Sequence, residues 1–339
     1  MNAAYLACGG WIASAVGAAA TLRLADLMAD QARSPRELAE ATGTSEAVLG
    51  HVMRLLAAVG LFTETADGRY RNAPDAELLR EGHPASMRSF CMLAAGDYQR
   101  ICHELIHSLE TGEPAARWAV GGSLYAHLER DPAAAETYDR AMEDLSRPMG
   151  VAFAAATDLA DVRTVADVGG GRGGLIKGLL RARSSLRGLV VDRPDVCERA
   201  RAGLGRTDPD LVGRLDYVAG DLFGMRPVGA DLYVLKNVLR NWSDEACLRL
   251  LRSIGGAMAE DRAARLVVID TRIDADLPPL YRALDAMVPA IISEPGARLR
   301  QPGEIGALLE QAGFTVAHTE NLTAQHLLVE ARAAARRGA

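Results

Sequence analysis

The chain is poor in cysteine, and the few cysteines it has form no recognisable framework. Five occur in 339 residues, scattered and odd in number, without any Cys-x-x-Cys pair. A disulfide-stabilised domain or a cysteine-ligated zinc site would need closely paired spacings. The pattern instead predicts free thiols in a reducing compartment, so we expect a cytoplasmic protein.

Basic residues are fewer than acidic ones, and the chain has no clear signal peptide or membrane-spanning segment. The 38 Lys and Arg residues are outnumbered by 44 Asp and Glu residues, which gives a net charge of −6. This balance argues against a protein that binds nucleic acid irrespective of sequence, because such binding needs many cations on phosphates. The apolar stretch Gly9–Leu22 has no basic segment before it and is followed by Arg23 and Asp26. It predicts a buried helix rather than a signal peptide or a membrane span.

A glycine-rich run is the most informative feature that is present. In Thr164–Leu175 a β-branched segment reaches an acid, breaks into glycines and resumes as an apolar helix. Glycine is needed where the backbone turns tightly and lies close to a ligand. A second strand-like run ends at Asp192, where a carboxylate can accept hydrogen bonds from both hydroxyls of a ribose. The pair predicts a nucleoside-containing cofactor; a tight turn without a ligand is the alternative.

Three details of this run favour S-adenosylmethionine over other nucleoside cofactors. The dinucleotide fingerprint opens the first βαβ unit of a chain, whereas Gly169–Gly174 lies deep in this one. Asp167 stands two residues before the glycines, where it could meet a cationic amino group. No Gly-Lys-Ser or Gly-Lys-Thr is present, which excludes a phosphate-binding P-loop.

The first third of the chain is helical and has the outline of a winged helix. Ser34 and Glu37 form a capping box around Pro35, which predicts the start of a helix. A second apolar-periodic helix follows, and a turn at Asp67-Gly68 predicts a small hairpin. A DNA-binding regulator must therefore be considered. The predicted recognition helix carries little basic charge, which argues against it.

The pattern changes near residue 155, from helices to short apolar runs that alternate with helices. This alternation predicts a mostly parallel, doubly wound α/β sheet. We therefore expect a helical domain over residues 1–155 and an α/β domain over 156–339, with a frayed basic tail from Ala331. The predicted strands are Val165–Val168, Leu189–Asp192, Leu215–Val218, Leu232–Leu235, Leu266–Ile269 and His326–Val329.

One short motif suggests zinc. His103-Glu104-Leu105-Ile106-His107 matches the zincin pattern, in which two histidines one helical turn apart bind the metal. No Gly-x-x-His follows to supply a third ligand, so we expect no metal. Two histidines on one face of a helix could instead form a proton-transfer pair or simply be packing residues.

Several ordered motifs together resemble a known family. They are the winged-helix segment, Asp167–Gly171, Val191–Pro194, Gly220–Phe223, Leu235–Trp242, Gly296–Gln301 and Ala312–Phe314. With these motifs the chain resembles, nearly end to end, the small-molecule O-methyltransferases of the plant caffeate type and their bacterial natural-product relatives. The resemblance implies a Rossmann-like class I S-adenosylmethionine fold, a winged-helix dimerisation domain and a domain-swapped homodimer.

The resemblance also implies site residues. Expected cofactor contacts are Asp167, Gly169, Gly171, Asp192, Arg193, Asp221, Phe223 and Lys236, with the ribose on Asp192 and the adenine near Asp221 and Phe223. Expected to contact the acceptor are Tyr138, Met142, Trp242 and Arg300.

The departures from the family pattern concern catalysis. Where the family has Leu-His-Asp-Trp, with histidine as general base, this chain has Leu239-Arg240-Asn241-Trp242. Arginine stays protonated and cannot act as that base. The family's Gly-Gly-x-Glu-Arg, whose glutamate orients the histidine, is replaced by Gly296–Arg300, while Asp270 can retain the other acid. The replacement of both the histidine and the glutamate resembles the pattern of the anthracycline-tailoring branch of this family.

Two enzymatic hypotheses follow, beside the DNA-binding one. The first is an O-methyltransferase for an aromatic or polyketide-like natural product that works by positioning alone. The second is a homologue that binds S-adenosylmethionine but catalyses a hydroxylation, cyclisation or coupling. In either, we expect Arg240 to stabilise an oxygen anion of the substrate and Asn241 to add a hydrogen bond. His103 or His107 is the remaining candidate if a proton must be taken.

Overall fold

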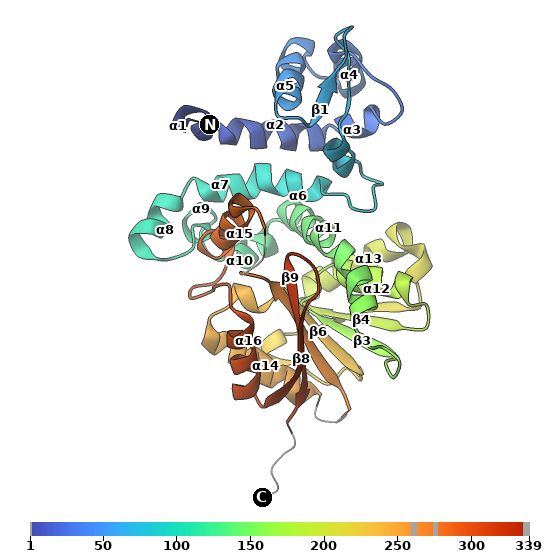
Figure 1. Ribbon diagram of the computed structural model, residues 1–339, viewed down its shortest axis with the longest axis vertical. Coiled ribbons are helices and arrows are strands. Elements are labelled where there is room, and N and C mark those ends of the chain that lie inside the picture. Colours follow the sequence, from blue (N-terminus) through green and yellow to red (C-terminus); the bar gives the residue numbers. More distant parts are fainter. Residues whose placement is uncertain (1, 259–262, 274–276, 335–339) are drawn as a thin grey trace, which may run out of the picture. The chain divides into compact units, whose positions relative to one another are not determined.

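The chain folds into two compact units, which differ from the division expected at residue 155. The computed structural model describes residues 2–258, 263–273 and 277–334. One unit comprises Met1–Arg100 and Pro132–Leu145, and the other Ile101–Asp131 and Ser146–Ala339 (Figure 1). Residues 101–131 belong with the sheet because they pack on it through helix α15 (Pro279–Ile292). The Ala115 N–H, for example, donates to the Ala290 carbonyl.

The first unit contains the expected winged helix. The Ser34 hydroxyl accepts from the Glu37 N–H, and the Glu37 carboxylate accepts from the Ser34 N–H at 2.7 Å, which confirms the capping box. Ser45 occupies the N-cap position of the next helix, without a capping hydrogen bond from its side chain. The described elements of this unit are α1 (Ala3–Ala7), α2 (Gly9–Thr21), α3 (Leu24–Leu27), α4 (Pro35–Thr42), α5 (Glu46–Ala58), β1 (Phe62–Glu64), β2 (Tyr70–Asn72), η1 (Pro74–Leu79), α6 (Arg88–Leu93), η2 (Ala94–Tyr98), the start of α7 (Gln99–Cys102) and the first part of α11 (Pro132–Ala156).

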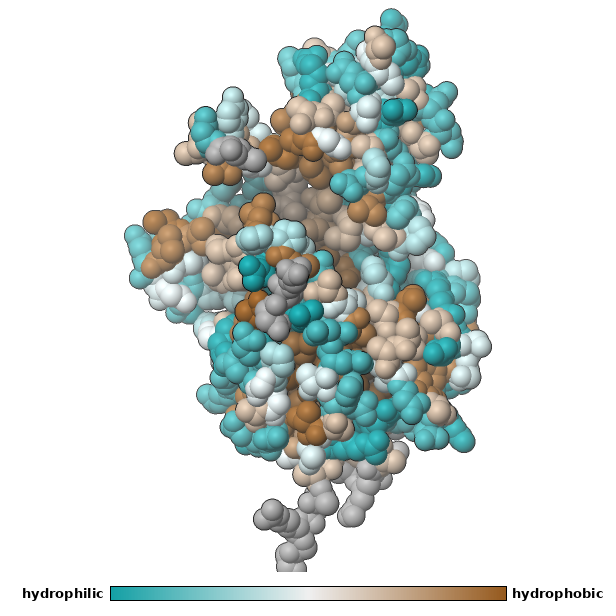
Figure 2. All heavy atoms as spheres, in the orientation of Figure 1, coloured by the Kyte–Doolittle hydropathy of each residue, from teal (hydrophilic) through white to brown (hydrophobic). Residues whose placement is uncertain are grey.

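The apolar N-terminal segment is buried on one side only. Helix α2 buries small residues such as Ala15 and Ala19, while Trp11 on it is 71% exposed. Tyr5 and Leu6 in the preceding helix are 68% and 64% exposed. Apolar surface follows the line of α2 in Figure 2. Among the described residues, none of the helices combines the length and hydropathy that a membrane span requires.

The second unit is built on a seven-stranded sheet of order β5-β4-β3-β6-β7-β9-β8, in which β9 runs antiparallel to β7 and β8. This confirms the doubly wound α/β class, and all six predicted strands are present. The strands are β3 (Thr164–Val168), β4 (Arg187–Asp192), β5 (Leu215–Ala219), β6 (Leu232–Lys236), β7 (Arg265–Thr271), β8 (Phe314–Asn321) and β9 (His326–Ala333).

At the C-terminus the sequence analysis missed one strand, and one of its expectations was wrong. Strand β8 escaped the sequence analysis because it is an edge strand whose residues are mostly exposed and polar. The basic tail was expected to begin at Ala331, but this residue is fully buried and pairs with Leu266 of β7. Residues 335–339 of that tail lie outside the described residues.

Helices cover both faces of the sheet (Figure 1). The last part of α11 packs with α12 (Gly174–Ala182) and α13 (Pro194–Thr207) on one face, in a core that includes Phe153 and Leu179. On the other face α14 (Asp244–Ala257) and α16 (Pro302–Gln311) enclose a second core. The remaining helices of this unit are α8 (Leu105–Thr111), α9 (Ala116–Ala119), α10 (Leu124–Arg130), η3 (Pro209–Leu211), η4 (Leu222–Gly224) and η5 (Leu239–Asn241).

Candidate functional site

A row of charged side chains lies at the carboxyl edge of the parallel strands. Asp192 ends β4, Asp167 is the penultimate residue of β3, and Lys236 ends β6. Strand β3 lies between β4 and β6, and here the strand order changes direction. Ligands of open α/β sheets bind outside the carboxyl ends of the strands at such a switch point. The three charged residues therefore surround the place where the topology predicts a ligand.

The glycine-rich loop forms a cradle beside this row. Gly169, Gly171 and Gly173 have φ values of +75°, +59° and +82°, and residues that carry a side chain rarely adopt such values. The Gly171 N–H donates to Asp192 Oδ2 at 2.7 Å, and the Arg193 N–H donates to Asp192 Oδ1 at 2.8 Å. A Cβ on Gly171 would meet no atom within 4 Å, so the loop is open on that side. The Asp192 carboxylate can accept further hydrogen bonds and lies beside an open backbone loop, so it can bind the hydroxyls of a ribose.

Aromatic rings gather on the other side of the strand ends. The Asp221 carboxylate accepts from the Phe223 N–H at 2.9 Å and so shapes the short helix η4. The ring of Phe223 lies edge-on to Trp242 with centroids 4.9 Å apart. Trp242 is in turn nearly parallel to Tyr125, with a 14° interplanar angle and centroids 6.4 Å apart. Such flat apolar surfaces fit a purine. Together with the glycine-rich loop and the Asp192 carboxylate, they form a surface suited to a nucleoside.

Arg193 has contacts that the sequence did not predict. Its Nη1 donates to the Tyr125 carbonyl at 3.3 Å and to the Glu129 carboxylate at 3.0 Å, and its guanidinium lies over the Tyr125 ring. Arg193 therefore holds helix α10 against the start of α13. Its expected contact with the cofactor stays a prediction.

Asp167, which is buried, and Lys236, which is half-buried, influence each other's ionisation. Burial, together with the charge of Asp192, raises the pKa of the Asp167 carboxyl to about 7, although Lys236 opposes this. Burial and the charge of Arg240 lower the pKa of Lys236 to about 8. The Lys236 ammonium also donates to the Ser146 hydroxyl on α11 at 3.2 Å. The two shifts bring the pKa of the Asp167 carboxyl and the pKa of the Lys236 ammonium toward each other.

Arg240 is a buried residue with protein partners on both of its terminal nitrogens. Nη2 donates to Asp285 Oδ1 at 2.8 Å and to the Asp285 carbonyl at 3.2 Å. Nη1 donates to the Thr271 hydroxyl and, at 3.4 Å, to Asp285 Oδ2. The side chains of Arg240 and Asp285 are 7% and 22% exposed. The guanidinium therefore joins η5 to the end of β7 and to α15, and its expected action on a substrate oxygen stays a prediction.

The polar side chains of Asn241 and Asp270, near Arg240 in the sequence or on β7, also form hydrogen bonds within the protein. The Asn241 amide donates to the Asn237 carbonyl at 3.0 Å, and its oxygen accepts from the Ser293 hydroxyl at 3.1 Å. Asp270 is buried at the end of β7 and accepts from the Thr271 N–H at 2.8 Å. Burial raises the pKa of its carboxyl. The geometry gives Asn241 and Asp270 a structural role, and their catalytic roles stay predictions.

Arg300 is buried and forms hydrogen bonds within the protein. Nη1 donates to the Leu239 carbonyl and Nη2 to the Trp242 carbonyl, both at 2.7 Å. Nε donates to the Asp244 carboxylate at 2.8 Å, and the side chain is 1% exposed. All three nitrogens are thus committed to η5 and the start of α14. The expected contact of Arg300 with the acceptor stays a prediction.

The two histidines of the zincin-like motif do not share a continuous helix. Helix α7 ends at Cys102 and α8 begins at Leu105, so His103 stands in the intervening turn. His103 is exposed, whereas His107 stacks on Trp118 with ring centroids 5.4 Å apart and pairs with Glu104 at 3.3 Å. The expectation of two histidines on one helix face was therefore wrong. A role for either in proton transfer stays a prediction.

Tyr138 and Met142 lie in the part of α11 that belongs to the first unit, where both are half-buried. Their contact with an acceptor stays a prediction. The sequence analysis also missed Tyr125, Ser146, Thr271 and Asp285, which no motif marks. Only the apolar positions of α15 that flank Asp285 could have drawn attention to this acid.

Comparisons with known proteins match this chain to O-methyltransferases over most of its length. Residues 103–315 match the O-methyltransferase domain, and residues 5–82 match the O-methyltransferase dimerisation domain. The second match assigns the winged helix to dimerisation and removes the main argument for a DNA-binding regulator. The mitomycin biosynthesis 6-O-methyltransferase of Streptomyces lavendulae is 36% identical over 310 residues, which cover 91% of this chain and 87% of that protein.

Solved structures support the same comparison. The mitomycin 7-O-methyltransferase MmcR is 34% identical, with a TM-score of 0.83 over 97% of this chain and 96% of that one. The O-methyltransferase NcsB1 from neocarzinostatin biosynthesis was solved with S-adenosyl-L-homocysteine and 1,4-dihydroxy-2-naphthoic acid. It is 32% identical, with a TM-score of 0.77 over 98% of this chain and 99% of that one.

Proposed function

Since this chain belongs to the S-adenosylmethionine-dependent O-methyltransferase family, we propose that it methylates a hydroxyl group of an aromatic or polyketide-like natural product. S-adenosylmethionine supplies a methyl group that is already activated for transfer. The observation that carries the proposal is the cradle at the strand ends, where Asp192 is held by the Gly171 N–H beside Asp167 and Lys236.

The chain's own residues would act by binding and orientation. Asp192 would hold the ribose, and Asp167 would face the cationic part of the cofactor. Asp221 and Phe223 would lie near the adenine, and Trp242 would contact the acceptor. Because arginine at position 240 stays protonated, no base is available there. Aligned approach of an acidic phenol can supply most of the rate without one.

The second candidate is a homologue that binds the cofactor but catalyses a non-methylating tailoring reaction. The observation that favours it is the Arg240–Asp285 ion pair, because the resemblance implies a titratable base at position 240, where this chain has a buried arginine. An arginine there could stabilise an enolate or a phenolate through its remaining N–H.

One assay separates the two candidates. The purified protein is incubated with S-adenosylmethionine and phenolic acceptors of one to three rings, and S-adenosylhomocysteine is measured by mass spectrometry. O-methyl transfer predicts stoichiometric S-adenosylhomocysteine and an acceptor heavier by one CH₂. Conversion of the acceptor without S-adenosylhomocysteine would favour the second candidate.

We expect cofactor affinity to be greatest between about pH 7 and pH 8. Below pH 7 Asp167, whose pKa is raised to about 7, must lose a proton before it can face a cation, so affinity falls as the pH falls. Above pH 8 Lys236, whose pKa is lowered to about 8, loses the charge that would attract the cofactor's carboxylate. Calorimetry from pH 5.5 to pH 9 measures this profile. Asp167→Asn should remove the dependence on the acidic side, and a flat wild-type profile would contradict the assignment.

We also expect a homodimer. The dimerisation-domain match covers the helices on which Tyr5, Leu6 and Trp11 are exposed, and adjacent large apolar side chains of this kind mark an association surface. Light scattering at micromolar concentration should give twice the chain mass. Trp11→Glu should shift the equilibrium toward monomers, whereas Val212→Glu, at an exposed apolar residue of the other unit, should not. A monomeric wild-type protein would overturn this expectation.

A further inference from the structure

His326 is a half-buried histidine at the carboxyl edge of the parallel strands, outside every motif of the family resemblance. It is the first residue of β9 and pairs with Thr271, the last residue of β7. Directly opposed residues of antiparallel strands have their side chains on the same face of a sheet. Lys236 at the end of β6 pairs with Ile269, two residues before Thr271, so it shares this face. His326, Thr271 and Lys236 thus lie on one face of three neighbouring strands.

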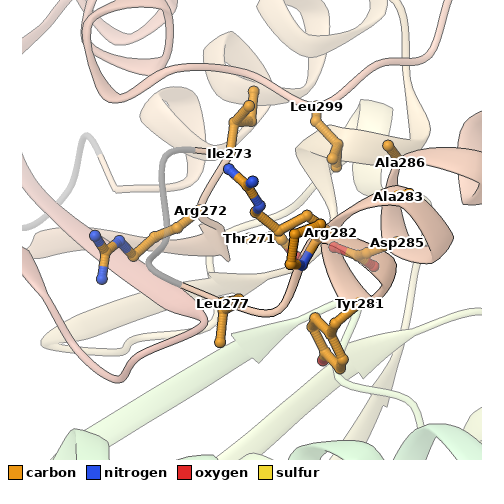
Figure 3. A pocket seen from close by; sticks show the side chains of 11 residues that line it. Thr271, Arg272, Ile273, Leu277, Tyr281, Arg282, Ala283, Asp285, Ala286 and Leu299 are labelled. Carbon is orange, nitrogen blue, oxygen red and sulfur yellow. The ribbon is translucent and has the colours of Figure 1, made fainter.

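The turn before β9 adjoins a cavity of about 270 Å³ between the end of β7 and helix α15 (Figure 3). Tyr281 and Arg272 line this cavity, and both are bound to the turn. The Tyr281 hydroxyl donates to the Gln325 side chain at 3.0 Å, and the Arg272 N–H donates to the Gln325 carbonyl at 2.9 Å. Thr271 also lines the cavity and accepts from Arg240. Because residue 240 occupies the position of the family's base, an acceptor oxygen is expected close to it.

The local hydrogen bonds fix which ring nitrogen of His326 carries the proton. The Thr323 hydroxyl oxygen accepts from the Gln325 N–H and from the His326 N–H, both at 3.1 Å. With both of its lone pairs engaged, this hydroxyl is left to donate, and His326 Nδ1 lies 3.4 Å from it. Nδ1 therefore accepts, which places the proton of the neutral ring on Nε2. In the part of the chain that the structure describes, Nε2 has no hydrogen-bond partner and is not sealed from solvent.

Charged groups on three elements act on this imidazole. Burial, together with the positive charges of Lys236 on β6 and Arg240 on η5, lowers the pKa of His326 to about 4, although Asp285 on α15 opposes this. The ring is therefore uncharged at neutral pH and offers a neutral N–H. A group with so low a pKa takes a proton from a phenol only weakly, so His326 does not replace the missing base.

Resting on the proposed function, we infer that His326 is a hydrogen-bond donor for the oxygen of an acceptor that binds as a phenolate. The Nε2–H donates to this oxygen, and the positive charges of Lys236 and Arg240 favour an anion near it. The acceptor loses its proton to bulk water before it binds, so the site needs no base. The substrate class narrows to acidic phenols, in which an electron-withdrawing group stands ortho or para to the hydroxyl.

Three substitutions at position 326 separate a donor from a base and from a packing residue. His326→Gln keeps an N–H near the position of Nε2 but takes up no proton at neutral pH. His326→Asn reaches only the position of Nδ1, and His326→Leu keeps only the bulk. The probe is 4-nitro-1-naphthol, whose anion absorbs visible light, titrated into protein saturated with S-adenosylhomocysteine.

We expect wild type to bind the probe as its anion and His326→Gln to bind it nearly as well. His326→Asn and His326→Leu should bind it about tenfold to a hundredfold more weakly, the usual loss for a hydrogen bond to a charged group. In turnover these two variants should raise KM for the naphthol and leave KM for S-adenosylmethionine unchanged. The ratio of the affinities of wild type and His326→Gln should not change between pH 5.5 and pH 8, because residue 326 is uncharged in both.

The matched control is a second histidine of the same hairpin. His318 on β8 is exposed and lies near Glu320, so His318→Leu removes an imidazole away from the strand ends. It should leave the affinity for the naphthol unchanged. Equal affinity of all variants for S-adenosylhomocysteine shows that the cofactor site is intact in each.

The outcomes separate this inference from the proposed function. Wild-type affinity for the naphthol in both His326→Asn and His326→Leu would overturn the donor role, while methyl transfer itself stands. A loss of turnover in His326→Gln as large as in His326→Leu would make His326 a proton acceptor and also overturn it. Methylation of weakly acidic phenols without binding of the naphthol would overturn the acidic acceptor class. Absence of methyl transfer to every phenol, with S-adenosylmethionine bound, would overturn the proposed function.

Discussion

Replacing Asp192 with alanine is expected to lower the affinity for S-adenosylmethionine by about 10- to 150-fold. The expected loss is about 1.5–3 kcal/mol, the usual value for hydrogen bonds to a charged group. Asp192 is expected to accept from the ribose hydroxyls, and it also accepts from the Gly171 N–H at 2.7 Å. The substitution thus removes a ligand contact and loosens the cradle that surrounds the ligand. Isothermal titration calorimetry measures the change.

Two further variants make the Asp192 result specific. Asp192→Asn keeps the shape and one acceptor oxygen, so it should lose less affinity than alanine. Asp216→Ala, at an exposed acid on the neighbouring strand β5, removes the same charge away from the cradle and should bind as wild type does. Unchanged affinity in Asp192→Ala would mean that the cofactor lies elsewhere.

Adding a single methyl group at Gly150 should destabilise the second unit by about 3 kcal/mol, at the upper end of the range for overpacking. Helices α11 and α12 approach so closely at this point that a Cβ on Gly150 would lie 2.2 Å from the Leu175 carbonyl oxygen and 2.6 Å from the Leu179 nitrogen. Both are backbone atoms, so the helices themselves must separate. Because α12 follows the glycine-rich loop directly, the separation should also disturb the cradle and weaken cofactor binding.

Chemical denaturation of Gly150→Ala measures the loss of stability. The matched control is Gly256→Ala, because Gly256 is exposed in helix α14 and a Cβ there meets nothing within 4 Å. Alanine should stabilise that helix by up to about 1 kcal/mol through its higher helix propensity. Equal stability of the two variants would show that the α11–α12 contact is looser than the structure indicates.

The cofactor cradle could be predicted from sequence because its chemistry is local. Thr164–Leu175 contains a strand, a turn that requires glycine and a helix start within twelve consecutive residues, and Asp192 ends the next apolar run. Each of these preferences acts over a few neighbouring residues. The capping box at Ser34 and Glu37 was predictable for the same reason.

The partners of Arg240 could not be predicted in this way. Asp285 lies 45 residues further along the chain, on a helix whose periodicity says nothing about which acid faces the strand ends. The zincin-like motif was misleading because its local pattern predicts one continuous helix, whereas the chain turns at His103. The contacts of Arg300 with the Leu239 and Trp242 carbonyls and with the Asp244 carboxylate were likewise not predictable, because only the folded chain brings these groups together.

The sequence by itself determined the α/β class, the winged helix and the position of six strands of the large sheet, since periodicity, capping and turn chemistry are properties of short segments. Only the tertiary structure decided which distant side chains meet beyond the ends of the strands. It placed residues 101–131 beside the sheet, brought Tyr125 against Trp242 and gave Arg240 an acid from α15. Those pairings depend on how helices pack on the sheet, and the free energy of that packing is shared among residues far apart in the chain.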